Sequence, residues 1–327
     1  MRTLAIRIHR HGGAEQLEPE EISIPAPGSG EVIVRNTAIG VNYADIYERT
    51  GDPGGPHASR QLPITPGHMA AGQVETVGPD VAVLRPGMRV GYIGGDAYAG
   101  HTRVAANRLL HLPDNVSDDV IGGYLLRGLT AEYLLRRLFP VKPGTVALVH
   151  AAAGGMGLIL GQWGALLGAR MIGTVSTPEK AEIARAHGYT DLIDYASEDF
   201  AARTMELTGG KGADVIYDGV GKATFRKSLD CVRARGMVIS YGTASGNVGA
   251  FDLQLLHARS IIVTRPTLRS WIAEPHELQD AARALFDVLG GGKIRTPISA
   301  RLPLADAAEA HRRLESRGLE APLILIP

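Results

Sequence analysis

The sequence contains one cysteine, Cys231, in 327 residues. A single cysteine cannot form a disulfide within the chain, which favours the reducing cytoplasm over an oxidising compartment. It also excludes a structural zinc site of four cysteines. No apolar run reaches the roughly 18 residues of a membrane span, and the first residues, MRTLAIRIHRHGG, lack the apolar core of a signal peptide. We therefore expect a cytoplasmic protein without a membrane segment.

Excess charge of either sign is also missing. The 34 basic and 34 acidic residues give a formal net charge of zero, and no long run of Lys or Arg occurs. Proteins that bind nucleic acid or anionic membranes usually carry a basic patch, so neither partner is expected. The hydrophobic share of 45% is ordinary for a globular protein. A small molecule is the expected partner.

Residues 1 to about 120 contain short runs typical of strands, separated by turns rich in Gly and Pro. The runs include EVIVRNTAI, GQVETVG and RVGYIG, and the turns include PAPGSG, GDPGGP and RPGM. This pattern predicts a β-rich domain. Similar segments, KIRTPIS and APLILIP, return after Thr264, so we expect the C-terminal residues to complete the first domain.

From about Lys142 the pattern changes to strands that alternate with helical segments. Six strand candidates follow one another: TVALVH, RMIGTV, DLIDY, DVIYDGV, GMVISYG and SIIVT. Such alternation is typical of an α/β fold with a doubly wound parallel sheet. The helix after the second candidate is well marked, because Thr177 can cap it, Pro178 suits its first turn and Gly188 can end it.

A glycine-rich turn, HAAAGGMG, directly follows the first of these strands and opens a long apolar helix. Ala152, Gly154 and Gly157 have the spacing of the G-x-G-x-x-G dinucleotide fingerprint, and alanine can fill the first position if its φ is negative. Gly154 would let the backbone approach a pyrophosphate, and Gly157 would let the helix pack closely on the strand. The alternative is a turn without a ligand, but the strand–turn–helix context favours a nucleotide site.

The end of the second strand indicates which dinucleotide binds. An NAD site usually has an Asp or Glu here for the ribose 2′-hydroxyl, whereas this chain has Thr174, Val175, Ser176 and Thr177. Lys180, one turn into the next helix, could pair with a 2′-phosphate. The alternative for Lys180 is a lysine on a solvated helix face. The segment therefore predicts NADP(H).

Eight segments spread over the whole chain carry a resemblance to a known family: HRHGGAEQL, AIGVNYADIYERTG, PGHMAAGQVETVG, LRGLTAEYLLRR, VHAAAGGMGLILGQWGALLGARMIGTVSTPEKA, TGGKGADVIYDGVG, VTRPTL and LESRG. The chain resembles the zinc-independent, zeta-crystallin-like quinone oxidoreductases of the medium-chain dehydrogenase/reductase superfamily, most closely those of bacteria. The resemblance implies a GroES-like β-rich catalytic domain formed by residues 1–124 and 267–327. It implies an NADPH-binding Rossmann domain at 125–266, with a six-stranded parallel sheet, and a homodimer. We expect the two copies to pair through the edge strand near Ile262.

The catalytic candidates come from the same resemblance. Asn42, Asp45 and Tyr47 match the family segment that lines the nicotinamide and quinone cleft. Arg127 stands where the family commonly has lysine, and it keeps the charge but not the shape. The alternatives are that Asp45 only caps the short helix it begins and that Tyr47 is a core aromatic.

The cofactor-binding candidates are more numerous. Lys180, Tyr195 and Arg317 match positions that hold the adenosine 2′-phosphate. The remaining candidates lie in the glycine-rich turn, at strand ends or at matched family positions: Asn42, Thr130, Ala153, Gly154, Gly155, Met156, Gly157, Thr174, Ser176, Val220, Tyr241, Gly242, Thr264, Arg265 and Pro266.

His68, in GHM, stands where zinc-dependent relatives carry a ligand. The next residue is methionine, the one cysteine is distant in the sequence, and the eleven histidines show no ligand-like spacing. We therefore expect no metal and a structural role for His68. Without a zinc ion to acidify an alcohol, an electrophilic acceptor is the expected substrate.

The leading hypothesis is an NADPH-dependent quinone reductase. Hydride addition to a quinone gives a phenolate with a pKa near 10, which water can protonate, so positioning would supply most of the catalysis. An NADPH-dependent reductase of α,β-unsaturated carbonyls needs the same cofactor and remains an alternative. A third alternative is an NADPH-binding structural or RNA-binding protein of low turnover, as some relatives of this family are.

Overall fold

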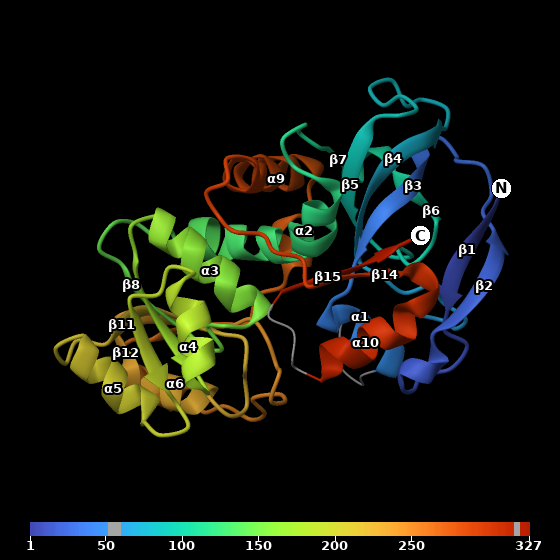
Figure 1. The fold of residues 1–327 in the computed structure, drawn as a ribbon. Helices are drawn as coiled ribbons and strands as arrows, with labels where there is room; N and C mark the ends of the chain where they lie inside the picture. The colour runs from blue at the N-terminus through green and yellow to red at the C-terminus, as the bar shows by residue number, and fades with distance from the viewer. Residues whose placement is uncertain (52–59, 317–320) are drawn as a thin grey trace. The chain divides into compact units, whose positions relative to one another are not determined.

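The computed structural model describes residues 1–51, 60–316 and 321–327. The contacts within the chain define two compact units, the first formed by Met1–Gly128 with Leu278–Pro327 and the second by Leu129–Glu277. The first unit therefore contains both ends of the chain. In Figure 1 the red C-terminal strands lie beside the blue strand β3 in this unit.

The first unit is built on a sheet in the order β14-β15-β3-β4-β5-β7, with β6 also paired to β3. A separate antiparallel pair joins β1 to β2. The strands of this unit are β1 (Arg2–Arg7), β2 (Glu18–Ser23), β3 (Glu31–Gly40), β4 (Met69–Val77), β5 (Arg89–Ile93), β6 (His101–Ala105), β7 (Leu109–His111), β14 (Ala300–Pro303) and β15 (Leu323–Ile326). The antiparallel pairing of β15 with β3 brings the C-terminal residues into this unit, as expected.

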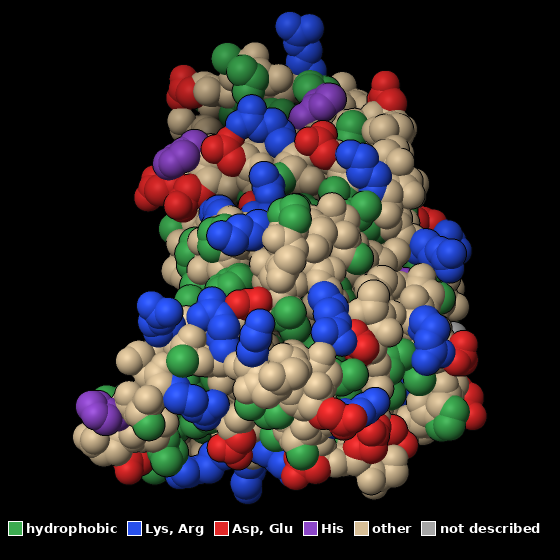
Figure 2. All heavy atoms as spheres, turned by 90° about the vertical axis from the view of Figure 1, so that its left-hand side faces the viewer, with side chains coloured by type: hydrophobic (Ala, Val, Ile, Leu, Met, Phe, Trp, Pro, Cys, Tyr) green, Lys and Arg blue, Asp and Glu red, His purple; other side chains and the backbone are tan. Residues whose placement is uncertain are grey.

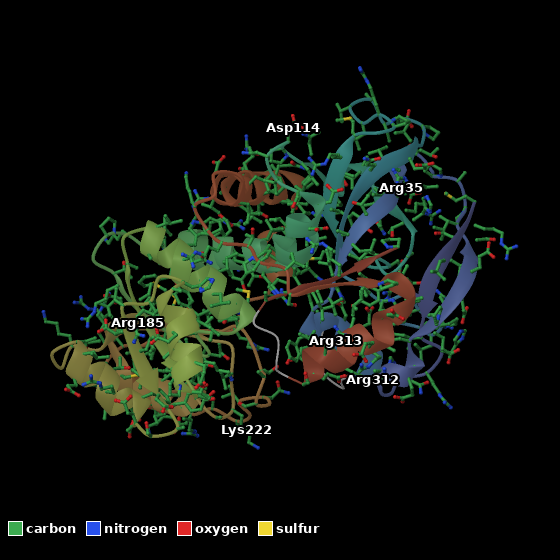
Figure 3. All side chains as sticks on the ribbon, in the orientation of Figure 1. Arg35, Asp114, Arg185, Lys222, Arg312 and Arg313 are labelled. Atoms are coloured by element: carbon green, nitrogen blue, oxygen red, sulfur yellow. The ribbon has the colours of Figure 1, made fainter. Side chains whose placement is uncertain are left out.

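Helices cover the core of the first unit. They are α1 (Tyr43–Thr50), α2 (Asp118–Glu132), which continues into the second unit, α9 (Pro275–Gly290) and α10 (Ala307–Glu315). On α10, the buried Ala307, Ala310 and Leu314 recur at helical spacing and join the core of the sheet. Arg313 pairs with Glu309 on the exposed face of the same helix (Figure 3). The helix is therefore amphipathic, with its apolar stripe against the strands.

The second unit contains a sheet of six parallel strands in the order β10-β9-β8-β11-β12-β13. Its strands are β8 (Val146–Val149), β9 (Arg170–Val175), β10 (Asp191–Asp194), β11 (Ala213–Asp218), β12 (Val232–Ser240) and β13 (Ile262–Thr264). In chain order this is the 3-2-1-4-5-6 arrangement of dinucleotide-binding folds. The six-stranded doubly wound sheet predicted from the sequence is confirmed.

The helices of the second unit connect these strands. They are α3 (Gly155–Leu166), α4 (Pro178–Arg185), α5 (Phe200–Leu207), α6 (Phe225–Cys231), α7 (Gln254–His257) and α8 (Leu268–Trp271), with a π-helical segment, η3 (Tyr133–Leu138), after α2. The cap expected for α4 is present, because the Thr177 hydroxyl accepts from the Lys180 N–H. The helix ends at Arg185, and Gly188 lies in the following turn with φ of 94°. Among the described residues, none of the helices is long and apolar enough to cross a membrane.

The domain bounds expected from the sequence, at 124/125 and 266/267, remain a prediction, and the contacts within the chain divide it at other positions. The first falls between Gly128 and Leu129, inside the continuous helix α2, where no loop marks it. The second falls after Glu277, in the first turn of α9, and the second unit therefore includes α8. There the Trp271 ring stacks on Tyr133 at 5.4 Å. A contact between residues so far apart in sequence leaves no local signal.

Candidate functional site

The turn after β8 and the first turn of α3 pack closely on each other. Gly154 is the N-cap of α3, and its N–H donates to the Ala151 carbonyl at 2.9 Å. A Cβ on Gly157 would lie 2.4 Å from the carbonyl oxygens of both Ala151 and Ala152, closer than real Cβ atoms come. Only glycine fits at 157 without moving the turn. The first N–H groups of α3 have no partner inside the helix, so they can bind an anion.

The carboxyl end of β9 carries hydroxyl groups and no acid. The buried Thr174 hydroxyl accepts from the Ala151 N–H at 3.2 Å. The Lys180 Nζ donates to the Ser176 hydroxyl at 3.2 Å. Glu179, also on α4, receives a hydrogen bond from Thr177 that holds the pKa of its carboxyl below the usual value. An exposed lysine and a serine therefore lie together where an NAD site has its acid.

Tyr195 follows the neighbouring strand β10. Its N–H donates to the Val175 carbonyl at 3.1 Å, which holds this residue beside the end of β9. The side chain is 53% exposed. The ends of β9 and β10 thus present Ser176, Lys180 and Tyr195 along one edge of the sheet.

The loops after β11 and β12 are tied to each other through Asp218. Its fully buried carboxylate accepts from the Val220 N–H at 2.8 Å, and its carbonyl accepts from the Tyr241 N–H at 2.9 Å. A Cβ on Gly242 would lie 2.5 Å from the Gly219 carbonyl oxygen. Two predicted cofactor segments are therefore in close backbone contact at the carboxyl edge of the sheet.

A buried hydroxyl without a partner marks the end of β12. The Ser240 Oγ has no hydrogen-bond partner in the part of the chain that the structure describes. The backbone carbonyl of Ser240 accepts a hydrogen bond from Arg265 Nη1 at 2.8 Å. This bond links the end of β12 to the Thr264–Pro266 segment at the end of β13. Buried polar groups are normally hydrogen-bonded, so the Ser240 hydroxyl is an exception at this edge of the sheet.

In the first unit, Asp45 is the centre of a buried hydrogen-bond network. The Asn42 N–H donates to Asp45 Oδ2 at 2.7 Å, and the Tyr98 hydroxyl donates to the same oxygen at 3.2 Å. His68 Nδ1 lies in hydrogen-bonding contact with the other oxygen, Oδ1. Asp45 is fully buried, and it caps the N-terminus of α1. Capping was the alternative to a catalytic role for this residue.

Acidic neighbours determine the charge of His68. Burial would lower the pKa of His68, but the hydrogen bond and the charge of Asp45 outweigh it and raise the pKa above its usual value. His68 Nε2 is also 4.0 Å from a carboxylate oxygen of Glu48, whose own pKa is raised by burial. The two carboxylates thus stabilise the protonated form of His68 relative to a histidine in water.

Metal-ligating side chains come together elsewhere in the first unit. Among the described residues, one group of three has ligand atoms close enough to share an ion: His9, Glu18 and Glu20. His9 and Glu18 are exposed and Glu20 is half-buried. The group lies on and beside the β1–β2 pair, and none of its members is a predicted site residue.

Asn42 is the N-cap of α1, Tyr47 lies within this helix, and Arg127 contacts the residue before Asn42. The Asn42 side-chain nitrogen is buried without a hydrogen-bond partner among the described residues. Arg127 on α2 donates to the carbonyl of Val41 at 3.4 Å, and burial lowers the pKa of its guanidinium. Tyr47 is half-buried, with its ring centre 6.4 Å from that of Tyr43. The structure thus offers an unpaired amide donor beside an arginine and two tyrosines.

The predicted site residues divide between the two units. The first unit holds Asn42, Asp45, Tyr47 and Arg127. The carboxyl edge and helices of the second unit hold Thr130, Ala153, Gly154, Gly155, Met156, Gly157, Thr174, Ser176, Lys180, Tyr195, Val220, Tyr241, Gly242, Thr264, Arg265 and Pro266. Arg317 lies outside the described residues.

Sequence analysis missed three polar residues at the ends of parallel strands: His150, Asp218 and Ser240. Asp218 had a usable signal, because an acid at the end of the apolar run DVIYDGV falls at the edge where α/β proteins bind ligands. Ser240 and His150 had no such signal, since their environments depend on contacts with distant segments.

Two family models match the chain. The alcohol dehydrogenase GroES-like domain matches residues 28–138, and the zinc-binding dehydrogenase domain matches residues 155–287. Quinone oxidoreductase from Pseudomonas aeruginosa is 44% identical over 98% of this chain and 99% of its own length. A 2-haloacrylate reductase from Burkholderia sp. is 42% identical over 99% of each chain.

A solved structure is also similar to this chain over nearly its whole length. The Escherichia coli quinone oxidoreductase, crystallised in complex with NADPH, matches with a TM-score of 0.94 and 40% sequence identity. The match covers 99% of this chain and 100% of that one. The two domain models, the full-length relatives and the shared fold agree with the glycine-rich turn and the strand order described above. The chain belongs to the quinone oxidoreductases of the medium-chain dehydrogenase/reductase superfamily.

Proposed function

We propose that the protein is an NADPH-dependent quinone reductase. The observation that carries this proposal is the end of β9, where Ser176 and Lys180 lie together and no acid opposes a 2′-phosphate. The P. aeruginosa relative supports the acceptor class, and the NADPH complex of the E. coli enzyme supports the cofactor.

The second unit fits such a cofactor. The pyrophosphate would bind at the N-terminus of α3, next to a turn in which only glycine fits at 157. Lys180 and Tyr195 would hold the 2′-phosphate. Ser240 offers a buried hydroxyl that lacks a partner among the described residues.

The first unit would orient the acceptor. Bound NADPH supplies the reducing equivalents, and the protein's own groups would place the acceptor and stabilise the charge that develops on its oxygen. The buried Asn42 side-chain nitrogen, which has no hydrogen-bond partner among the described residues, is one candidate donor to this oxygen. Tyr47 and Arg127 are the other candidates for this role. We assign Asp45 to positioning, because its buried carboxylate holds the Asn42 backbone.

We further propose that the reaction uses no zinc. Zinc catalysis by this fold would need further ligands beside His68, and the residue that follows His68 is a methionine, Met69. The single cysteine, Cys231, is buried in the core of the other unit. A quinone needs no Lewis acid, since its reduction product is a phenolate with a pKa near 10. The single cysteine also supports our proposal of a cytoplasmic location.

A second candidate function is the reduction of activated alkenes. The 2-haloacrylate reductase relative favours it, because that substrate class is an electron-poor alkene. The two functions separate in a steady-state assay that follows NADPH oxidation with phenanthrenequinone or with a panel of enones and acrylates. We expect the quinone to have the higher kcat/KM. A structural or RNA-binding role has less support, since basic and acidic side chains are interspersed on the face drawn in Figure 2.

We propose a homodimer paired through β13. This strand is at the edge of the six-stranded sheet, and its Ile262 side chain is 49% exposed. Leu253, directly before α7, is 71% exposed, and Leu255, within α7, is 44% exposed. An apolar sheet edge of this kind is normally covered or paired, and pairing with a two-fold copy would continue the sheet.

Ile262→Asp should convert the dimer to a folded monomer. An unpaired charge buried in an interface costs several kcal/mol, so we expect the dissociation constant to rise by more than about 100-fold. Size-exclusion chromatography with light scattering measures the result. The matched control is Val83→Asp in the first unit, where the native side chain is 81% exposed. A monomeric unaltered protein, or equal effects of both substitutions, would exclude this interface.

A further inference from the structure

A continuous chain of hydrogen bonds runs through the buried His150 side chain, between the phosphate turn and α6. His150 Nδ1 is 3.2 Å from the Thr174 hydroxyl, and Nε2 is 2.9 Å from the Ser228 hydroxyl. The Thr174 hydroxyl accepts from the Ala151 N–H, and the Ser228 hydroxyl donates to the Thr224 carbonyl at 2.9 Å. The chain therefore starts at the backbone of the turn and ends inside a helix.

The donors in this chain can be assigned from its two ends. Because Ser228 uses its proton on the Thr224 carbonyl, its oxygen accepts from His150 Nε2–H. Burial lowers the pKa of His150 to about 4, although the charge of Asp218 opposes this shift. His150 is therefore neutral, and its Nδ1 accepts the Thr174 proton. That leaves the Thr174 oxygen free to accept from the Ala151 N–H.

The residue at the turn end of the chain has an unusual backbone. Ala151 has φ of 54°, in the left-handed region that favours glycine. Three hydrogen bonds stabilise the backbone of Ala151 and of the residue after it. The Ala151 N–H donates to the Thr174 hydroxyl, the Ala152 N–H donates to the Thr174 carbonyl, and the Gly154 N–H donates to the Ala151 carbonyl. The Ala151 carbonyl is also one of the two atoms that exclude a side chain at Gly157. The conformation of Ala151 therefore affects how closely the turn packs on the first turn of α3.

We propose that His150 is a positioning residue for the cofactor: through Thr174 it holds Ala151 in the left-handed conformation and so keeps the phosphate-binding turn in place. This inference rests on the proposed NADPH site. His150 does not touch the ligand. Its effect falls on the pyrophosphate, which NADPH and NADH share, and not on the 2′-phosphate.

His150→Phe tests the proposal, since the aromatic ring that packs edge-on against Phe200 at 4.7 Å is kept and both nitrogens are lost. We expect the dissociation constants of NADPH and NADH to rise by a similar factor, about tenfold. Nicotinamide fluorescence measures both constants, and thermal melting without cofactor measures stability. At saturating NADPH, kcat should remain near that of the unaltered protein.

A second substitution separates positioning from simple packing. Ala151→Gly permits positive φ without strain, so in this background the turn no longer depends on His150. We expect Ala151→Gly to restore most of the cofactor affinity and melting temperature that His150→Phe loses. If His150→Phe causes the same losses with and without Ala151→Gly, the proposal is wrong.

Two further variants keep the test decisive. Should His150→Phe fail to fold, Thr174→Val removes the next link without changing side-chain shape, and it should show the same rescue by Ala151→Gly. Lys180→Ala serves as the contrast, because it should weaken NADPH alone. An unaltered protein that binds neither cofactor would refute the proposed function, while rescue of melting temperature would still report on the His150 chain.

Discussion

Gly157→Ala is expected to abolish NADPH binding at micromolar cofactor and to lower the melting temperature. The added Cβ would lie 2.4 Å from two carbonyl oxygens of the phosphate turn, so α3 or the turn must move. Overpacking of this kind typically costs about 1–3 kcal/mol, or roughly 3–10 °C in melting temperature. Losing two or more charge-assisted contacts to the pyrophosphate would raise the dissociation constant by more than about 100-fold.

The matched control is Gly154→Ala, in the same turn. Gly154 has φ of −81°, and a Cβ there would meet its nearest neighbour, the Ala151 carbonyl oxygen, at 3.1 Å. We expect it to change the melting temperature by less than about 2 °C, while its methyl group hinders the approach of a phosphate. Calorimetric titration and thermal melting of both variants measure the two effects. Full NADPH affinity in Gly157→Ala would contradict the assignment of the turn as the phosphate site.

Lys180→Ala should erase most of the preference for NADPH over NADH. The lysine is exposed and donates to the Ser176 hydroxyl at 3.2 Å, and the end of β9 carries no acid to favour NADH. A charge-assisted contact with a phosphate contributes about 1.5–3 kcal/mol, so the NADPH dissociation constant should rise roughly 10- to 100-fold.

The NADH dissociation constant should stay within about twofold of its original value, because an exposed lysine contributes little to the fold. Fluorescence titration with both cofactors provides the comparison. An equal loss of affinity for NADPH and NADH would show that Lys180 supports the structure and does not recognise the 2′-phosphate.

Features determined by neighbouring residues were predictable from the sequence. The six strands of the parallel sheet follow from runs of apolar residues, and the start of α4 follows from Thr177 and Pro178. The exposed position of β13 follows from its place as the last strand. In each case the pattern that predicts the element is also the pattern that stabilises it.

Features that depend on contacts between distant segments were not predictable. Alanine at position 152 fits the fingerprint only if its φ is negative, and Ala152 is not among the residues with positive φ; the left-handed residue is its neighbour Ala151. The conformation of Ala151 depends on Thr174, which lies in strand β9, and on the contact that the neighbouring His150 side chain makes with Thr174. The hydrogen bonds of Asp45 could not be predicted for the same reason. Its partners Tyr98 and His68 come from segments of the first unit that are distant in sequence.

For Arg127, the family resemblance predicts the charge of the side chain but not its contacts. The resemblance places it at a lysine position. In the structure it donates to the Val41 carbonyl, directly before Asn42, and burial lowers its pKa. Its hydrogen bond to the backbone suggests that a change at 127 affects the Asn42 segment as well as the acceptor.

The most direct test of a metal-free quinone reductase is a steady-state comparison of two reactions by one protein sample dialysed against EDTA. The first reaction is NADPH oxidation by phenanthrenequinone, and the second is NADP⁺ reduction by simple alcohols. We expect quinone turnover to be unchanged by the chelator and alcohol oxidation to be at least about a thousandfold slower. Alcohol oxidation comparable to quinone reduction, or quinone turnover lost in EDTA and restored by zinc, would contradict the account.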